Sequence, residues 1–154
     1  KTTYSEITEL VNPPITAIYD LILAGDGGVG KTTFVRRFAP EEFGMKFIVE
    51  APTYAFEPSV LIFSATIGLE IRPILLNTNH GIIQVNVRDT GGSEKFGGLR
   101  DGYYMGAHCA IIMFDATWRH SYKNTPIYYK DIMRVCENIP IALVASKVRR
   151  LHDK

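Results

Sequence analysis

The chain has few of the residues that mark metal-binding, secreted or strongly charged proteins. Its 154 residues include 2 cysteines and 4 histidines, and the formal net charge is +1. Cys109 and Cys136 lack metal-ligand spacing and lie in apolar surroundings, so we expect two reduced core cysteines of an intracellular protein. The histidines are scattered, which argues against a metal site built from them. The low net charge gives no electrostatic reason to expect a nucleic acid or an anionic membrane as partner.

Long apolar runs and a targeting segment are also missing. The apolar stretches are too short to span a bilayer, and no signal peptide is recognisable. A hydrophobic content of 46% is nevertheless ample for a core, and the length fits one domain. We therefore expect a single globular domain.

A glycine-rich loop directly follows the apolar residues 21–24. Residues 25–32 read G-D-G-G-V-G-K-T, which is a complete G-x-x-x-x-G-K-[ST] phosphate loop. Glycines let backbone N–H groups turn around phosphate oxygens, and a helix that begins at Lys31 points its positive end at the anion. The alternative is a glycine-rich turn without a ligand, which the position between a strand and a helix disfavours.

Each part of this loop has an expected role in binding a nucleotide. Lys31 should reach the β- and γ-phosphates and act in catalysis, and Thr32 should offer its hydroxyl to Mg²⁺. The expected nucleotide-binding residues here are Gly25, Asp26, Gly27, Gly28, Val29, Gly30, Lys31, Thr32 and Thr33.

The apolar pattern alternates between strands and helices. Strands are predicted at residues 15–24, 70–76, 82–89, 109–115 and 139–145, with a turn at 77–81, and helices at 31–38, within 95–105 and at 121–136. Continuous apolar runs are typical of strands covered on both faces. The order predicts a doubly wound α/β domain, which binds ligands beyond the carboxyl ends of its strands, where the phosphate loop, Asp89 and Asp115 emerge.

A second polar group follows the strand predicted at residues 82–89. Residues 89–94 read D-T-G-G-S-E, in which Asp89 can hold Mg²⁺ from the side opposite Thr32, and a following glycine can donate its N–H to the γ-phosphate. An ordinary strand-to-loop turn is the alternative.

Several segments resemble the Ran family of small Ras-type GTPases, which act in nucleocytoplasmic transport. They are residues 25–38, residues 86–104 with E-K-F-G-G-L-R-D-G-Y-Y, and residues 109–140 with C-A-I-I-M-F-D-A-T and R-V-C-E-N-I-P. Residues 65–81 resemble the first switch, the second strand and the hairpin turn of the same family.

The resemblance implies a fold, cofactors and partners. The fold is a P-loop NTPase domain of the small GTPase kind, with a doubly wound, mostly parallel sheet and helices on both faces. The cofactors are Mg²⁺ and GTP or GDP, and the activity is GTP hydrolysis. The expected partners are nuclear transport receptors, an exchange factor and a GTPase-activating protein, with no direct nucleic acid and no membrane. The chain should be a monomer found in nucleus and cytoplasm.

The same resemblance assigns roles outside the phosphate loop. Thr66 matches the first-switch threonine that binds Mg²⁺ and senses the γ-phosphate, while Asp89 and Gly92 match the metal-side aspartate and the second-switch glycine. Lys95 and Phe96 match second-switch residues that meet the import carrier nuclear transport factor two. The alternative for Phe96 is a core aromatic residue.

Two motifs depart from the family pattern. Ser93 stands where the family has the glutamine that orients the attacking water, so hydrolysis should be slow. Ser146, Lys147 and Arg149 stand where the family has N-K-x-D, whose aspartate accepts hydrogen bonds from guanine. Arg149 offers only donors, so guanine selectivity is in doubt, although Lys147 can still stack on the base.

The boundaries of the domain also differ from the family. We expect an N-terminal extension at residues 1–14 and a small GTPase domain at 15–154, interrupted by an insertion at 50–64. The insertion is either a docking surface or extra strand, or a retained intron, and we favour the intron. The last strand and helix of the family have no counterpart, so a fragment is expected.

The sequence is compatible with three functions. The first is a Ran-like GTP-binding switch. The second is a nucleotide-binding interaction module that does not hydrolyse, which Ser93 and Arg149 favour. The third is a phosphoryl-transfer enzyme that uses ATP, for which the sequence shows no substrate motif.

Overall fold

The computed structural model describes residues 14–38, 47–48, 68–91 and 100–151. Five predicted site residues therefore lie outside the described residues, namely Thr66, Gly92, Ser93, Lys95 and Phe96. The predicted insertion at 50–64 lies outside them as well.

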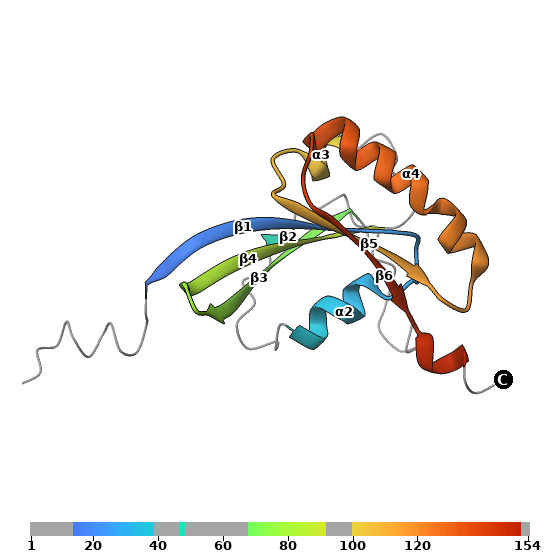
Figure 1. Ribbon diagram of the computed structural model, residues 1–154, viewed down its shortest axis with the longest axis horizontal. Coiled ribbons are helices and arrows are strands. Elements are labelled where there is room, and N and C mark those ends of the chain that lie inside the picture. The colour runs from blue at the N-terminus through green and yellow to red at the C-terminus, as the bar shows by residue number, and fades with distance from the viewer. Residues whose placement is uncertain (1–13, 39–46, 49–67, 92–99, 152–154) are drawn as a thin grey trace, which may run out of the picture.

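One sheet of six strands organises the described part of the chain (Figure 1). Its strands, in the order β2-β3-β4-β1-β5-β6, are β2 (Phe47–Ile48), β3 (Leu69–Thr78), β4 (Gly81–Thr90), β1 (Ile15–Ala24), β5 (Cys109–Asp115) and β6 (Ile141–Ser146). Strand β1 pairs in parallel with β4 and β5, and β5 pairs in parallel with β6, while the β2–β3 and β3–β4 pairs are antiparallel. The predicted mostly parallel sheet is confirmed.

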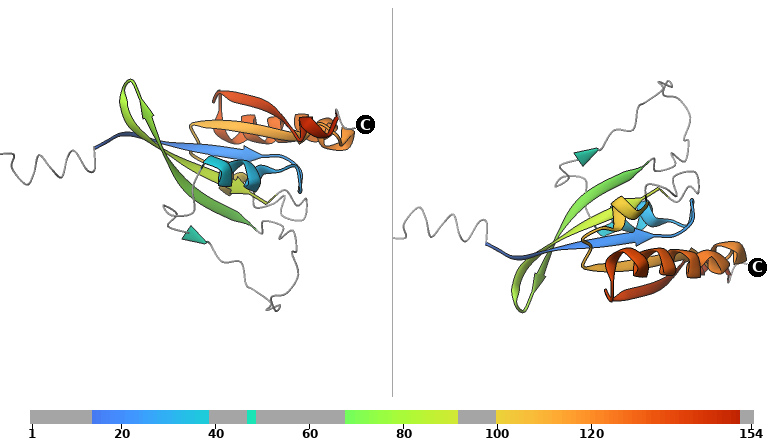
Figure 2. Two further views of the ribbon diagram at one scale, coloured as in Figure 1. Left: turned by 90° about the horizontal axis from the view of Figure 1, so that it is seen from below. Right: turned by 90° about the horizontal axis from the view of Figure 1, so that it is seen from above.

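Helices cover both faces of this sheet. Helix α2 (Lys31–Phe38) lies on one face, and α3 (Arg100–Tyr104) and α4 (Arg119–Cys136) lie on the other (Figures 1 and 2). A short 3₁₀ helix, η3 (Val148–Leu151), follows β6. This is the doubly wound α/β arrangement that the sequence predicts.

The two faces of the sheet carry separate apolar clusters because neighbouring strand residues point to opposite sides. Ile22 belongs to the cluster under α3 and α4, together with Tyr128 and Ile132. Leu23 belongs to the cluster under α2, together with Val35. The continuous apolar run at the end of β1 therefore reflects burial on both faces, as the sequence predicts.

Several predicted boundaries need correction. The hairpin strands β3 and β4 extend to Thr78 and Gly81, so the turn contains two residues instead of the five predicted at 77–81. Here the hydroxyl of Thr78 accepts a hydrogen bond from His80 N and donates one to Gly81 O, which supports the tight turn. Strand β6 spans Ile141–Ser146, whereas the sequence predicts residues 139–145. The strand therefore begins two residues later and ends one residue later than predicted.

Helix α4 continues through a proline and begins two residues before the predicted start at Ser121. Pro126 has no N–H, so it cannot donate to the carbonyl of Tyr122 four residues earlier. The Thr125 hydroxyl donates to that carbonyl instead, at 2.8 Å. A side chain thus replaces the missing helical hydrogen bond, which allows the helix to continue.

The two cysteines need a correction. Cys109 and Cys136 are free but only partly buried, so they are less central than the predicted core residues.

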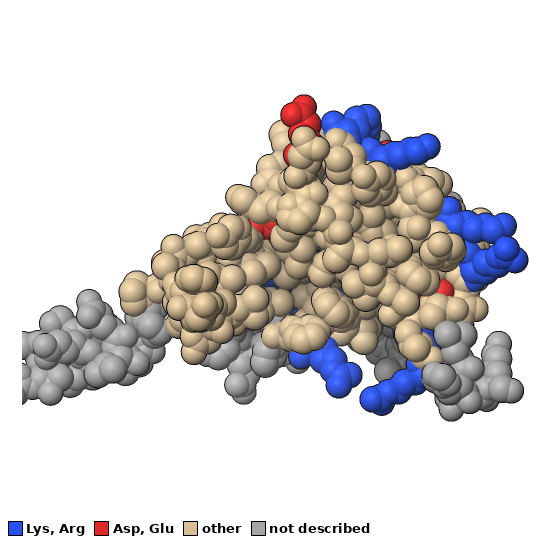
Figure 3. Space-filling view, in the orientation of Figure 1, with Lys and Arg blue, Asp and Glu red and all other residues tan. Residues whose placement is uncertain are grey.

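The surface shows where the charged side chains lie. On the face shown in Figure 3, the described Lys and Arg side chains lie around the rim, and uncharged residues fill the centre. Within the described ranges, no helix combines the length and apolar character needed to cross a bilayer.

Candidate functional site

The candidate site lies where four parallel strands end at the same edge of the sheet. The phosphate loop follows β1, Asp89 lies near the end of β4, Asp115 ends β5, and Ser146 ends β6. Because β1 pairs in parallel with β4 and β5, and β5 with β6, these positions converge. The predicted meeting of the phosphate loop, Asp89 and Asp115 at the carboxyl ends is therefore confirmed.

The loop between β1 and α2 depends on glycine. Gly25 has φ 139°, and a Cβ atom there would lie 2.2 Å from the carbonyl oxygen of Met113, so the loop starts against β5. Gly28 and Gly30 have φ 76° and 101°, values that residues with a Cβ rarely adopt. The loop therefore reverses direction where helix α2 begins, and its last glycine precedes the first turn of the helix.

Lys31 is held in the hollow of this loop and is only 5% exposed. Its Nζ donates to the carbonyl oxygens of Gly25 at 2.7 Å and Asp26 at 2.9 Å. An ammonium group has three N–H donors, and these two carbonyls use two of them. Burial lowers the pKa of Lys31 to about 8, although the carboxylates of Asp89 and Asp26 oppose the shift. An anionic ligand beside the amine would favour its charged form.

Thr32 and Asp89 form the second part of the site. The Thr32 hydroxyl donates to Oδ2 of Asp89 at 2.5 Å. Asp89 has no exposed surface, and burial raises its pKa despite the hydrogen bond from Thr32 and the charge of Lys31. Its other oxygen, Oδ1, is buried and has no hydrogen-bond partner among the described residues.

These residues fit a magnesium-bound phosphate group. Magnesium in nucleotide sites is held by one or two carboxylates, a hydroxyl, waters and phosphate oxygens, and seldom by a full set of protein ligands. The unpaired Oδ1 of Asp89 and the neighbouring Thr32 hydroxyl supply the first two ligand types. Accordingly, the described ranges contain no group of three His, Cys, Asp or Glu side chains that could hold a metal alone.

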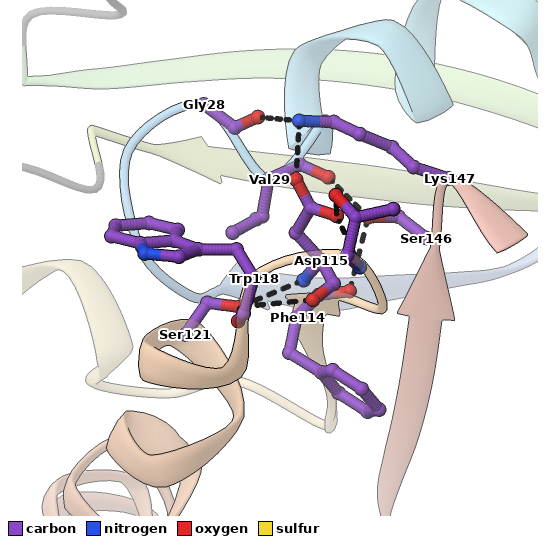
Figure 4. Close-up of polar contacts among 9 residues, drawn as sticks. Gly28, Val29, Phe114, Asp115, Trp118, Ser121, Ser146 and Lys147 are labelled. Atoms are coloured by element: carbon purple, nitrogen blue, oxygen red, sulfur yellow. Dashed lines mark hydrogen bonds and ion pairs between the residues drawn. The ribbon is translucent and has the colours of Figure 1, made fainter. Parts of the chain in front are cut away.

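The end of β6 is joined to the phosphate loop by two side chains (Figure 4). The Ser146 hydroxyl lies within hydrogen-bond distance of the carbonyl oxygens of Val29, at 2.6 Å, and Phe114, at 3.0 Å. Lys147 donates from Nζ to Gly28 O at 2.7 Å and to Oδ2 of Asp115 at 2.6 Å. These contacts fix the loop relative to the segment that is predicted to meet the base.

Asp115 connects the third strand end to this arrangement. Burial alone would raise its pKa, but hydrogen bonds from Lys147 and from Thr117 outweigh that effect, and the pKa lies below its usual value. The Thr117 N–H and hydroxyl both donate to Oδ1, at 2.8 and 2.7 Å. Asp115 therefore remains an acceptor for Lys147, and this hydrogen bond holds the Lys147 ammonium group over the loop.

Not all predicted residues converge equally. The loop residues, Asp89, Ser146 and Lys147 meet at the strand ends, whereas Thr33 and Arg149 have exposed side chains. Two residues at the site were not predicted to belong to it, namely Asn124 and Tyr128, which donate hydrogen bonds to the Asp26 carboxylate. Both lie within a helix and carry no local signal, whereas Asp115 was predicted at this edge because it ends an apolar strand.

A comparison with known protein families agrees with this geometry. The pattern of the Ras family matches residues 20–153, which include the phosphate loop, Asp89 and the end of β6. Members of this family are GTP-binding switches that bind GTP or GDP with Mg²⁺ and hydrolyse GTP. Together with its α/β fold, the match shows that the chain belongs to the Ras family.

Proposed function

We propose that this chain binds Mg²⁺-GTP and Mg²⁺-GDP and acts as a switch of the Ran type. Backbone N–H groups of the loop and the Lys31 amine would hold the phosphates, and Thr32 and Asp89 would hold the metal. Magnesium, when bound, neutralises phosphate charge. The chain's own side chains position the phosphate loop, because Ser146 and Lys147 already hold it against the end of β6.

One observation carries the nucleotide-binding part of this proposal. The Thr32 hydroxyl contacts Asp89 across 57 residues of sequence, and Asp89 keeps one buried oxygen without a partner among the described residues. An unpaired buried carboxylate oxygen is costly unless a ligand or a cation uses it. A metal-bound phosphate beside Lys31 would satisfy both the amine and the carboxylate.

The transport role rests on the resemblance of residues 65–81, 86–104 and 109–140 to the Ran family. In this proposal Thr66 and Gly92 sense the γ-phosphate, and Lys95 and Phe96 contact nuclear transport factor two. The nucleotide state would control binding of nuclear transport receptors, with regulation by an exchange factor and a GTPase-activating protein. The chain would act as a monomer in nucleus and cytoplasm.

State-dependent capture of transport proteins tests this role. We expect immobilised chain loaded with GDP to retain purified nuclear transport factor two, and chain loaded with a non-hydrolysable GTP analogue to retain transport receptors instead. Replacement of Phe96 by alanine should weaken capture of the first protein at least about tenfold, because an apolar anchor is lost. Equal capture in both nucleotide states would reject the switch, even if nucleotide binding itself is strong.

A second candidate function is a nucleotide-binding interaction module that does not hydrolyse GTP. The residue that favours it is Ser93, whose hydroxyl is too short for the water-orienting role of glutamine. In such a module the bound nucleotide would shape the partner surface without a timed return to the GDP state.

Replacement of Ser93 by glutamine separates the two functions. We expect Ser93→Gln to raise single-turnover hydrolysis of bound GTP by about tenfold or more, since water orientation is restored. The substitution should be made in two backgrounds, with and without residues 50–64, because the predicted insertion ends two residues before Thr66, which is proposed to bind the metal. An unchanged rate in the shortened background, with Mg²⁺-GTP bound, would remove this role from position 93.

A further inference from the structure

The phosphate loop has a polar connection to helix α4 that the loop motif does not account for. The Asp26 side chain, second in the loop, is 5% exposed, and its carboxylate accepts a hydrogen bond on each oxygen. Tyr128 donates its hydroxyl to Oδ1 at 2.8 Å, and Asn124 donates its side-chain amide to Oδ2 at 2.9 Å. These partners are 102 and 98 residues away along the chain.

Both donors are placed by the packing of α4. Asn124 and Tyr128 are four residues apart, so they lie on the same face of the helix. Tyr128 is 5% exposed and packs in the apolar cluster with Ile22 and Ile132. Its ring is thus fixed by the core, and its hydroxyl reaches the loop from a position that the loop does not determine.

The main chain of Asp26 leads from this connection to the proposed phosphate site. Its carbonyl oxygen accepts a hydrogen bond from Lys31 Nζ at 2.9 Å. One residue is therefore held by α4 through its side chain and by Lys31 through its backbone. A shift of α4 would move Asp26, and with it an acceptor that positions the lysine amine.

We propose that Asp26, Asn124 and Tyr128 form a tether through which helix α4 sets the conformation of the phosphate loop. Asn124 and Tyr128 are then positioning residues for nucleotide binding, since they act through Asp26 and need not touch the ligand. The tether has a role in binding only if the proposed nucleotide site exists. Its effect on the loop, however, is present without any nucleotide.

Removal of a single hydroxyl tests the tether. Tyr128→Phe keeps the ring in the core and deletes the donor to Asp26, so we expect GDP to dissociate about tenfold faster. Tyr129→Phe is the matched control, because it removes a hydroxyl from the next residue, whose side chain is 50% exposed. In an Asp26→Ala background, Tyr128→Phe should speed GDP dissociation much less than it does in the unaltered chain, since the acceptor in the loop is already gone.

A second measurement on nucleotide-free protein distinguishes failure of the tether from failure of the binding site. Backbone hydrogen exchange at residues 26–30 should become faster in Tyr128→Phe and stay unchanged in Tyr129→Phe. If the unaltered chain binds no nucleotide, the proposed function fails, but faster exchange still supports the tether. Equal exchange in the two variants, or equal GDP dissociation from them, would overturn it. A lower thermal midpoint with unchanged exchange at the loop would indicate a merely structural hydrogen bond.

Discussion

Replacement of Lys31 by alanine should reduce the affinity for Mg²⁺-GDP by at least about a hundredfold, because each lost hydrogen bond from a charged donor contributes roughly 1.5–3 kcal/mol. The amine is buried against the carbonyls of Gly25 and Asp26 and keeps a donor for phosphate. Alanine also removes the buried positive charge of the loop, and the Lys147 amine, which contacts Gly28 O, remains. Calorimetric titration of nucleotide-free protein measures the change.

A matched control separates this effect from a general loss of positive charge. Lys130→Ala removes an exposed lysine on α4 and should leave the affinity within about twofold, as exposed charges contribute little. Thr32→Asn should weaken binding in the presence of Mg²⁺ and have a smaller effect when the metal is removed with a chelator, since it disturbs the metal side of the site. Equal affinity of Lys31→Ala and the unaltered chain would contradict the proposed phosphate site.

The parts of the fold that the sequence predicts well are those with dense local signals. Strands β1 and β5 and helix α2 have the predicted limits. A continuous apolar run marks β5 and the end of β1, and the phosphate loop separates β1 from α2. The β3–β4 hairpin was predicted too short, since Asn77 and Thr78 resemble turn residues. Its ladder of paired backbone groups continues to Thr78 and Gly81 and overrides that local preference.

The candidate site divides in the same way. Lys31, Thr32 and Asp89 were predicted from motifs because their chemistry requires specific residues at fixed spacing. The contacts of Asp26 with Asn124 and Tyr128 join segments about a hundred residues apart, and no local pattern carries them. A single sequence shows that α4 has an apolar face, but the partner of a polar residue beside that face depends on how the helix packs.

The base-binding end of the site leads to the other large expected effect. Arg149 has an exposed side chain in η3, so its replacement should change the fold little. Guanine presents donors to this position in the family, and an arginine cannot accept them. The unaltered chain should therefore prefer GTP over ATP by less than about tenfold, because the hydrogen bonds that distinguish the two bases are lost.

Restoration of the acceptor should restore the preference. In the double variant Arg149→Asp with Ser146→Asn, we expect the ratio of GTP to ATP affinity to rise by about ten- to a hundredfold, which corresponds to one or two recovered hydrogen bonds of roughly 1–3 kcal/mol. Asparagine at 146 retains a donor for the carbonyls of Val29 and Phe114, so the link between β6 and the loop should survive. Lys147 is kept in both proteins.

Competition titrations with both nucleotides measure this ratio, and Arg119→Asp is the matched control. That substitution makes the same change of charge at an exposed position at the start of α4 and should leave the ratio unchanged. Strong GTP preference in the unaltered chain would show that Arg149 does not occupy the position of the family's aspartate. If the ratio rises equally in Arg119→Asp, the overall charge of the protein causes the rise, because a direct contact with the base would require the new carboxylate to stand at position 149.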